Sequence, residues 1–297
     1  MQEFWFLLQL IIQGLAIGSV YALVALGFVL IYKASSVINF AQGELLMVGA
    51  YICLALLATY QVPFWAGFIL TMAFSVVLAL CVERFILRPM IGEPIISIIM
   101  ITIGLSLVLK SIIAAIWGTQ IRVFPAIFPQ NPVQVGKIMV SQVYIYTFLA
   151  SMVFLILFAL FFKYSRMGIA MRATANSNQV ALSMGISVKK VFAVSWCVAA
   201  VVSAVGGILI GNINGVNISL SNVGLKVFPA VILGGLDSIP GAVLGGLIIG
   251  ILENLSGGYL DHFFGGGVKE VAPFVILVII LMIKPYGLFG TEEIERV

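Results

Sequence analysis

The sequence predicts an all-α, polytopic integral membrane protein with about eight apolar segments, and three observations support this. Hydrophobic residues make up 62% of the chain and charged residues 9%, whereas a soluble domain carries about 25% charged residues. Several apolar runs approach or exceed the roughly 20 residues that cross a bilayer as a helix. The basic residues gather at the ends of these runs, as orientation signals do. We expect one transmembrane domain over residues 1–297.

The first half of the chain contains four apolar runs, at residues 4–32, 37–60, 64–82 and 94–117. The run at 4–32 would be about 42 Å long as a helix, so it should tilt or break. The run at 64–82 should be stopped by Glu83, Arg84 and Arg88-Pro89. Lys110 in the fourth run can extend its ammonium group to the membrane surface.

The most informative segment is a polar loop at residues 163–190, which contains five basic residues and no acidic residue. A wetter stretch at 118–141 and an apolar run at 142–162 precede it, and another apolar run, 191–211, follows it. A short basic loop between two spans is expected on the cytoplasmic side. Its middle favours a small helix that ends at Gly185, lying at the membrane surface.

The apolar segment 226–252 is interrupted by Gly234-Gly235 and by Pro240-Gly241, which favour a turn. Arms of 226–236 and 241–252 would each be about 17 Å long, too short to span a bilayer alone. We therefore predict a broken or re-entrant helix hairpin, followed by a glycine-rich loop at 253–267 and a last span at 268–283.

Orientation follows from the same hairpin. If 163–190 is cytoplasmic and 226–252 enters and returns, the segment after Lys284 is also cytoplasmic. This arrangement places ten of the fifteen basic residues inside, which agrees with the positive-inside rule. The N-terminus is then outside, and no removable signal peptide is expected there.

Polar residues inside apolar runs are the candidates for a substrate path, because charged groups in lipid usually face a cavity or a partner. They are Asn39, Gln42 and Glu44 at the start of the second run, and Asp237 and Ser238 at the hairpin break. The hairpin residues could equally serve packing alone. Cys53, Cys81 and Cys197 are expected to be buried apolar groups, and no metal-ligand spacing, catalytic constellation or Gly-x-x-x-x-Gly-Lys-Ser/Thr loop is present. The net charge of +4 gives no sign of nucleic-acid binding.

Four ordered motifs resemble the membrane permease subunit of bacterial branched-chain amino acid ABC importers, the leucine/isoleucine/valine permease family. They are Gly18-Ser-Val-Tyr-Ala-Leu, Ile38-Asn-Phe-Ala-Gln-Gly-Glu, the segment Val231–Gly250, and the ending Lys284-Pro-Tyr-Gly-Leu-Phe-Gly. The resemblance covers nearly the whole chain. Ribose-type sugar permeases share the Gly-Gly…Gly segment, and urea or short-amide permeases share almost everything, so these remain alternatives.

The resemblance implies a pore-forming subunit in the bacterial inner membrane that works by alternating access. It further implies a second homologous permease, two cytoplasmic ATPases that bind ATP and Mg²⁺, a soluble substrate-binding protein, and no cofactor in this chain. Loop 163–190 would then be the coupling loop. The family pattern there is Glu-Ala-Ala-x-x-x-Gly, of which Gln179-Val180-Ala181-x-x-x-Gly185 keeps Ala181 and Gly185. Together with Arg172 and Gln179, these are the expected ATPase contacts.

Two other function classes are less well supported. A stand-alone carrier or channel built from inverted repeats would show the broken segment in both halves, and the sequence has no second copy of the Gly-Gly…Pro-Gly break. An enzyme would need a nucleophile, a metal cluster or paired acids. His262 is the only histidine and has no such partner in the sequence.

Overall fold

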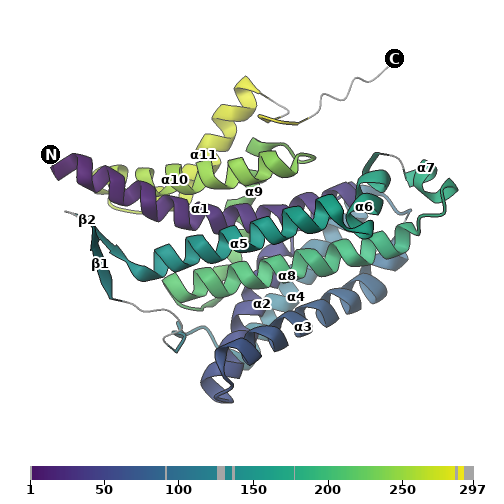
Figure 1. Cartoon of the computed structure of the whole chain (residues 1–297), viewed down its shortest axis with the longest axis horizontal. Helices are drawn as coiled ribbons and strands as arrows, with labels where there is room; N and C mark the ends of the chain where they lie inside the picture. Colours follow the sequence, from purple (N-terminus) through teal and green to yellow (C-terminus); the bar gives the residue numbers. More distant parts are fainter. Residues whose placement is uncertain are drawn as a thin grey trace.

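The computed structural model describes residues 2–90, 92–125, 131–135, 138–176, 178–284 and 287–290. They form an elongated helical bundle with one small two-stranded sheet (Figure 1). Helices α6 and α7 lie at one end, which we call the α6 end. The sheet and the start of α1 lie at the other, which we call the β1 end. Of the closing motif, Lys284 and residues 287–290 are described, and residues 291–297 lie outside the described part.

The long helices follow the predicted apolar runs closely. Their bounds are α1 Gln2–Ser35, α2 Gln42–Leu54, η1 Ala55–Thr59, α3 Phe64–Val82, η2 Glu83–Leu87, η3 Arg88–Met90, α4 Ile95–Trp117, β1 Pro132–Val135, β2 Ile138–Ser141, α5 Gln142–Tyr164, α6 Arg166–Asn176, α7 Asn178–Ser183, α8 Val188–Asn214, η4 Ile218–Ser221, α9 Asn222–Gly234, α10 Ile239–Phe264 and α11 Val268–Ile283. In the described part, seven helices are long and apolar enough to cross a membrane. The all-α membrane class is therefore confirmed.

Three local features add to the predictions. The first apolar run, expected to tilt or break, forms one unbroken helix, α1, of 34 residues, about 50 Å long. Helix α3 ends at Val82, and short helical turns continue through Glu83, Arg84 and Arg88-Pro89 to Met90. In these turns the Arg88 guanidinium donates to both Glu83 carboxylate oxygens, at 3.0 and 2.8 Å. The wetter stretch before α5 contains an antiparallel ribbon, β1–β2, that the sequence did not suggest.

Two segments turn back into the bundle instead of joining helices at its surface, and we call residues 36–41 and 215–221 the return segments. The first leaves α1 at the α6 end and brings the start of α2 beside Gly27 of α1. The second leaves α8 at the β1 end and brings the start of α9 against Gly43 of α2. The two helix starts therefore meet inside the bundle, with α2 leading to the β1 end and α9 to the α6 end.

The two halves of the chain are arranged around this meeting point so that corresponding helices run in opposite directions. Helices α1, α2 and α3 correspond in order to α8, α9 and α10, and α1 packs on α10 as α8 packs on α3. The repeated feature is the return segment, not the Gly-Gly…Pro-Gly break that the sequence analysis searched for. Discontinuous helices in inverted halves are frequent in membrane transporters.

The predicted hairpin at 226–252 is correct in its break and wrong in its second arm. The break falls at 235–238, between α9 and α10, where the Ser238 hydroxyl accepts a hydrogen bond from the Gly241 N–H at 3.1 Å. Helix α9 has 13 residues, but α10 has 26 and is long enough to span alone. The expected loop at 253–267 is thus mostly helix, because Glu253 and Asn254 find partners inside the bundle.

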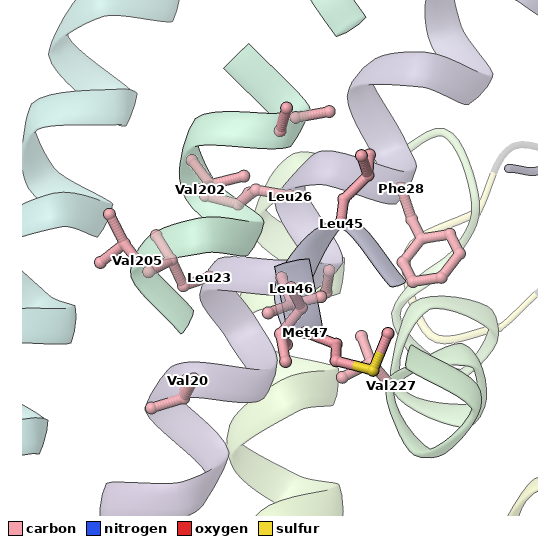
Figure 2. Packing of buried hydrophobic residues seen from close by; sticks show 14 of the residues in the cluster. Val20, Leu23, Leu26, Phe28, Leu45, Leu46, Met47, Val202, Val205 and Val227 are labelled. Atoms are coloured by element: carbon pink, nitrogen blue, oxygen red, sulfur yellow. The ribbon is translucent and has the colours of Figure 1, made fainter. Parts of the chain in front are cut away.

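The interior is built by α1, α2, α8 and α9, whose apolar side chains interdigitate around Leu46 and Met47 (Figure 2). Helix α10 approaches α1 through small residues. A Cβ atom on Gly246 would lie 2.4 Å from the Ala22 nitrogen, and one on Gly250 would lie 2.2 Å from the Gly18 Cα. Gly246 and Gly250 of α10 therefore pack against the Gly18–Ala22 motif of α1, so two of the four sequence motifs touch.

This contact predicts that Gly250→Ala destabilises the chain, because the added methyl group meets the backbone of α1 and the two helices must separate. Overpacking of this kind costs about 1–3 kcal/mol. The matched control is Gly104→Ala on α4, where a Cβ meets no atom within 4 Å. Thermal unfolding in detergent should show a lower midpoint for Gly250→Ala alone; equal midpoints for both variants would contradict the close packing.

Candidate functional site

Asn39 and Gln42 form a buried hydrogen-bond network at the start of α2. The Asn39 amide donates to Gln42 Oε1 at 3.1 Å, and Asn39 Oδ1 accepts from the Ala41 N–H at 3.0 Å. Gln42 Nε2 donates to the Ser203 hydroxyl at 2.6 Å and to the Ala199 carbonyl at 3.3 Å. These bonds fix the first return segment to α8. The two side chains are thereby positioned as internal supports, and a role in lining a substrate path stays a prediction.

Glu44, the third candidate at this helix start, lies between α2 and α4. It is 7% exposed, and the Ser106 hydroxyl and Lys110 ammonium groups of α4 interact with its carboxylate. The backbone N–H of Phe40 also donates to the Thr102 hydroxyl of α4 at 3.4 Å. The Lys110 ammonium group attracts the Glu44 carboxylate, and its extension to the membrane surface stays a prediction.

A second charged group, which the sequence analysis did not single out, joins α9, α10 and α11. Lys226 Nζ lies 3.1 Å from Glu253 Oε1 and 2.7 Å from Glu270 Oε1. The Glu253 side chain is 1% exposed and the Glu270 side chain is 64% exposed. The sequence signal that could have revealed this group is a lysine and a glutamate at the two ends of one apolar segment, because charged residues in such segments usually pair.

Arg172 on α6 turns back toward the bundle and caps the end of α5. Its guanidinium donates to the carbonyl oxygens of Phe162 and Lys163 and lies 5.4 Å from the Phe162 ring centroid. Gly168 packs so tightly here that a Cβ would clash with the Phe162 carbonyl, and its N–H donates to the Ser165 hydroxyl at 2.9 Å. Helix α6 is thus rigidly attached to a long apolar helix.

Comparisons with known proteins agree with these features. Residues 10–283 match the family described as "Branched-chain amino acid transport system / permease component". The chain belongs to this family. It is 32% identical over its whole length to the high-affinity branched-chain amino acid permease proteins LivH of Escherichia coli K12 and BraD of Pseudomonas aeruginosa, covering 99% and 100% of those proteins. A probable LivH of Methanocaldococcus jannaschii is 30% identical over 96% of the chain and 93% of the relative.

One solved structure has the same overall fold. PsaBC from Streptococcus pneumoniae, in complex with Fab, superposes with a TM-score of 0.52 over 94% of this chain and 91% of the other, at 13% identity. At that identity the likeness concerns the fold alone. The family match and the seven long apolar helices make the permease a multi-pass protein of the bacterial inner membrane.

Within the predicted coupling loop, the permease has two short helices where one was expected. Ala181 of α7 is buried, and Gly185 ends α7 in a left-handed conformation with φ of 80°. The Gly185 and Ile186 N–H groups bond back to the carbonyls of Leu182 and Ala181. The side chain of Gln179 lies outside the described residues. Apolar side chains are exposed around this turn, at Val180, Leu182 and Met184.

Asp237 and Ser238 are the other two predicted path residues, at the break between α9 and α10. They line a cavity of about 810 Å³ at the α6 end, together with Lys33, Lys163 and Arg172. The break between α9 and α10 is therefore adjacent to the coupling loop. A motion of α6 would change the walls of this cavity directly.

Gly185 provides a test of the coupling loop. Replacing it with Val should reduce uptake at least tenfold while membrane insertion stays normal, because a β-branched residue is strained at positive φ and the end of α7 would reshape the apolar patch. The control is Gly92→Val, a second positive-φ glycine with no atom within 4 Å of its Cβ. Full uptake by a well-inserted Gly185→Val variant would contradict the assignment.

Proposed function

We propose that this permease forms half of the translocation pore of an ATP-driven importer for branched-chain amino acids, working by alternating access. The carrying observation is the 32% identity over the full length of the chain to LivH and BraD, which are named as branched-chain amino acid transport permeases. The inverted halves, with two helix starts meeting in the interior, support the proposal because such discontinuities serve substrate passage in many transporters.

The proposal includes the partners that such a subunit needs. A second homologous permease completes the pore, two cytoplasmic ATPases bind ATP and Mg²⁺, and a soluble protein delivers the substrate. ATP hydrolysis belongs to the partners, since the sequence contains no phosphate-binding loop of the Gly-x-x-x-x-Gly-Lys-Ser/Thr type. The exposed apolar patch beside Gly185 supports docking of an ATPase there, because exposed apolar patches mark interaction surfaces.

The orientation is part of the same proposal: the α6 end faces the cytoplasm. Phe289 lines the same cavity as Arg172, so the chain after α11 returns to the α6 end. A reporter that is active only in the cytoplasm, fused after Val297, should be active, and the same reporter before Gln2 should be silent. If only the N-terminal fusion were active, the orientation of the chain would be the reverse of the one proposed.

The decisive experiment is to express the permease with and without the proteins encoded beside it. An ATPase should co-purify, and proteoliposomes with the complex and its binding protein should accumulate labelled leucine only with ATP. Competition of urea, short amides or ribose with labelled leucine tests whether the related substrate classes are carried. ATP-driven uptake of urea without leucine would replace the proposed substrate, and uptake by the permease alone would replace the ABC mechanism.

A further inference from the structure

The permease has a polar cavity beside the start of α9, on the half of the bundle toward the β1 end. It measures about 390 Å³ and is lined on its polar side by Asn214, Asn217, Ser219, Asn222, Lys226 and Glu270. The cavity joins the end of α8, the second return segment, α9 and α11. A surface that faces lipid is not lined by so many polar side chains, because unpaired polar groups are costly in hydrocarbon.

The two charges in this wall differ in how firmly they are held. Lys226 is 12% exposed and is shared between two carboxylates. Glu253 beneath it is buried, so this inner pair is fixed. Glu270 is 64% exposed, and exposed ion pairs contribute only about 0–1 kcal/mol. The Lys226–Glu270 contact can therefore open at small cost while Lys226 keeps Glu253 as its counterion.

We propose that this cavity binds a zwitterionic α-amino acid by insertion between Lys226 and Glu270, a site that rests on the proposed import function. The α-ammonium group takes the place of Lys226 at the Glu270 carboxylate. The α-carboxylate takes the place of Glu270 at the Lys226 ammonium, which has three donors. The ligand carries no net charge, so the charge balance of the three side chains is unchanged.

The remaining wall explains which amino acids fit. Ile210, Leu220 and Val223 also line the cavity and offer apolar contacts to an aliphatic side chain. An apolar wall with a few convergent polar groups is the usual composition of a small-molecule site. The cavity thus suits an aliphatic amino acid and disfavours a second charge on the side chain.

Glu270→Gln tests the site without disturbing the buried pair, since Lys226 keeps Glu253. In the assembled complex with its binding protein, ATP-driven leucine uptake should fall at least tenfold, while complex yield and thermal stability stay near wild type. Glu93→Gln makes the same change at an exposed loop position and should leave uptake unchanged. Wild-type uptake by Glu270→Gln would overturn the proposal.

A labelling experiment tests occupancy directly. A cysteine at exposed Ser219 should react with a water-soluble thiol reagent, and leucine should slow this reaction at least fivefold. Isoamylamine lacks the carboxylate and 4-methylpentanoate lacks the ammonium group, so neither should protect. Thr119→Cys, exposed near the β1 end and outside the cavity, should label equally with and without leucine, and the parent chain gives the background from the native cysteines.

The outcomes separate this site from the proposed function. Leucine uptake by the wild-type complex with no protection at residue 219, or equal protection by the two analogues, would keep the function and overturn the site. Loss of leucine protection in the Glu270→Gln background would support the site. A wild-type complex that imports no branched-chain amino acid would overturn the proposed function itself.

Discussion

Lys226→Met should destabilise the permease by about 3–5 kcal/mol, which is the usual cost of removing one partner from a buried ion pair. The methionine keeps most of the apolar stem but leaves the Glu253 carboxylate, 1% exposed, without its cation. The Tyr21 phenol lies near Glu253, but a neutral phenol cannot neutralise the carboxylate charge. Little folded protein should be recovered from membranes, as measured by monodispersity in detergent after purification.

A second substitution separates charge from packing. Glu253→Gln combined with Lys226→Met removes both charges and should restore most of the folded yield, because a neutral amide is much cheaper to bury than an unpaired carboxylate. If the double variant is as unstable as Lys226→Met, the effect comes from lost packing around α9 and not from the charge. The stability of Glu270→Gln should stay near wild type in the same assay.

The sequence was sufficient for the membrane class because hydrophobic run length is a direct consequence of bilayer thickness. It located the long helices and the break at 235–238, where Gly and Pro are explicit local signals. It misplaced the end of α10 because Glu253 looks like the edge of a span until Lys226, 27 residues earlier, is seen beside it. It could not find the return segments, whose conformation depends on contacts such as Gly43 with Gly224.

The candidate site, like the fold, could be predicted from the sequence only in part. Polar residues inside apolar runs were correctly recognised as unusual, but their partners are non-local: Gln42 reaches Ser203, 161 residues away. Asp237 and Ser238 were grouped with Asn39 by residue type, whereas the structure places them at the α6 end beside Arg172. Hydropathy gives the depth of a residue in a membrane only when its helix is continuous, and here two helices start in the interior.

Arg172→Ala should uncouple ATP hydrolysis from transport. The guanidinium ties α6 to the last carbonyl groups of α5, and charge-assisted hydrogen bonds of this kind are about twice as strong as neutral ones. Without them, α6 can move under an ATPase without moving α5. Leucine uptake in proteoliposomes should fall at least tenfold, while ATP hydrolysis by the purified complex stays within about twofold of wild type.

Two comparisons make this result specific. Arg172→Lys keeps the charge but loses the planar fork that reaches both carbonyl groups, so uptake should be intermediate. Arg84→Ala removes an exposed arginine from the turns after α3 and should transport normally. If Arg172→Ala instead lowers ATP hydrolysis and uptake together and the ATPase no longer co-purifies, Arg172 serves assembly with the ATPase, and force passes from α6 to the helices by another contact.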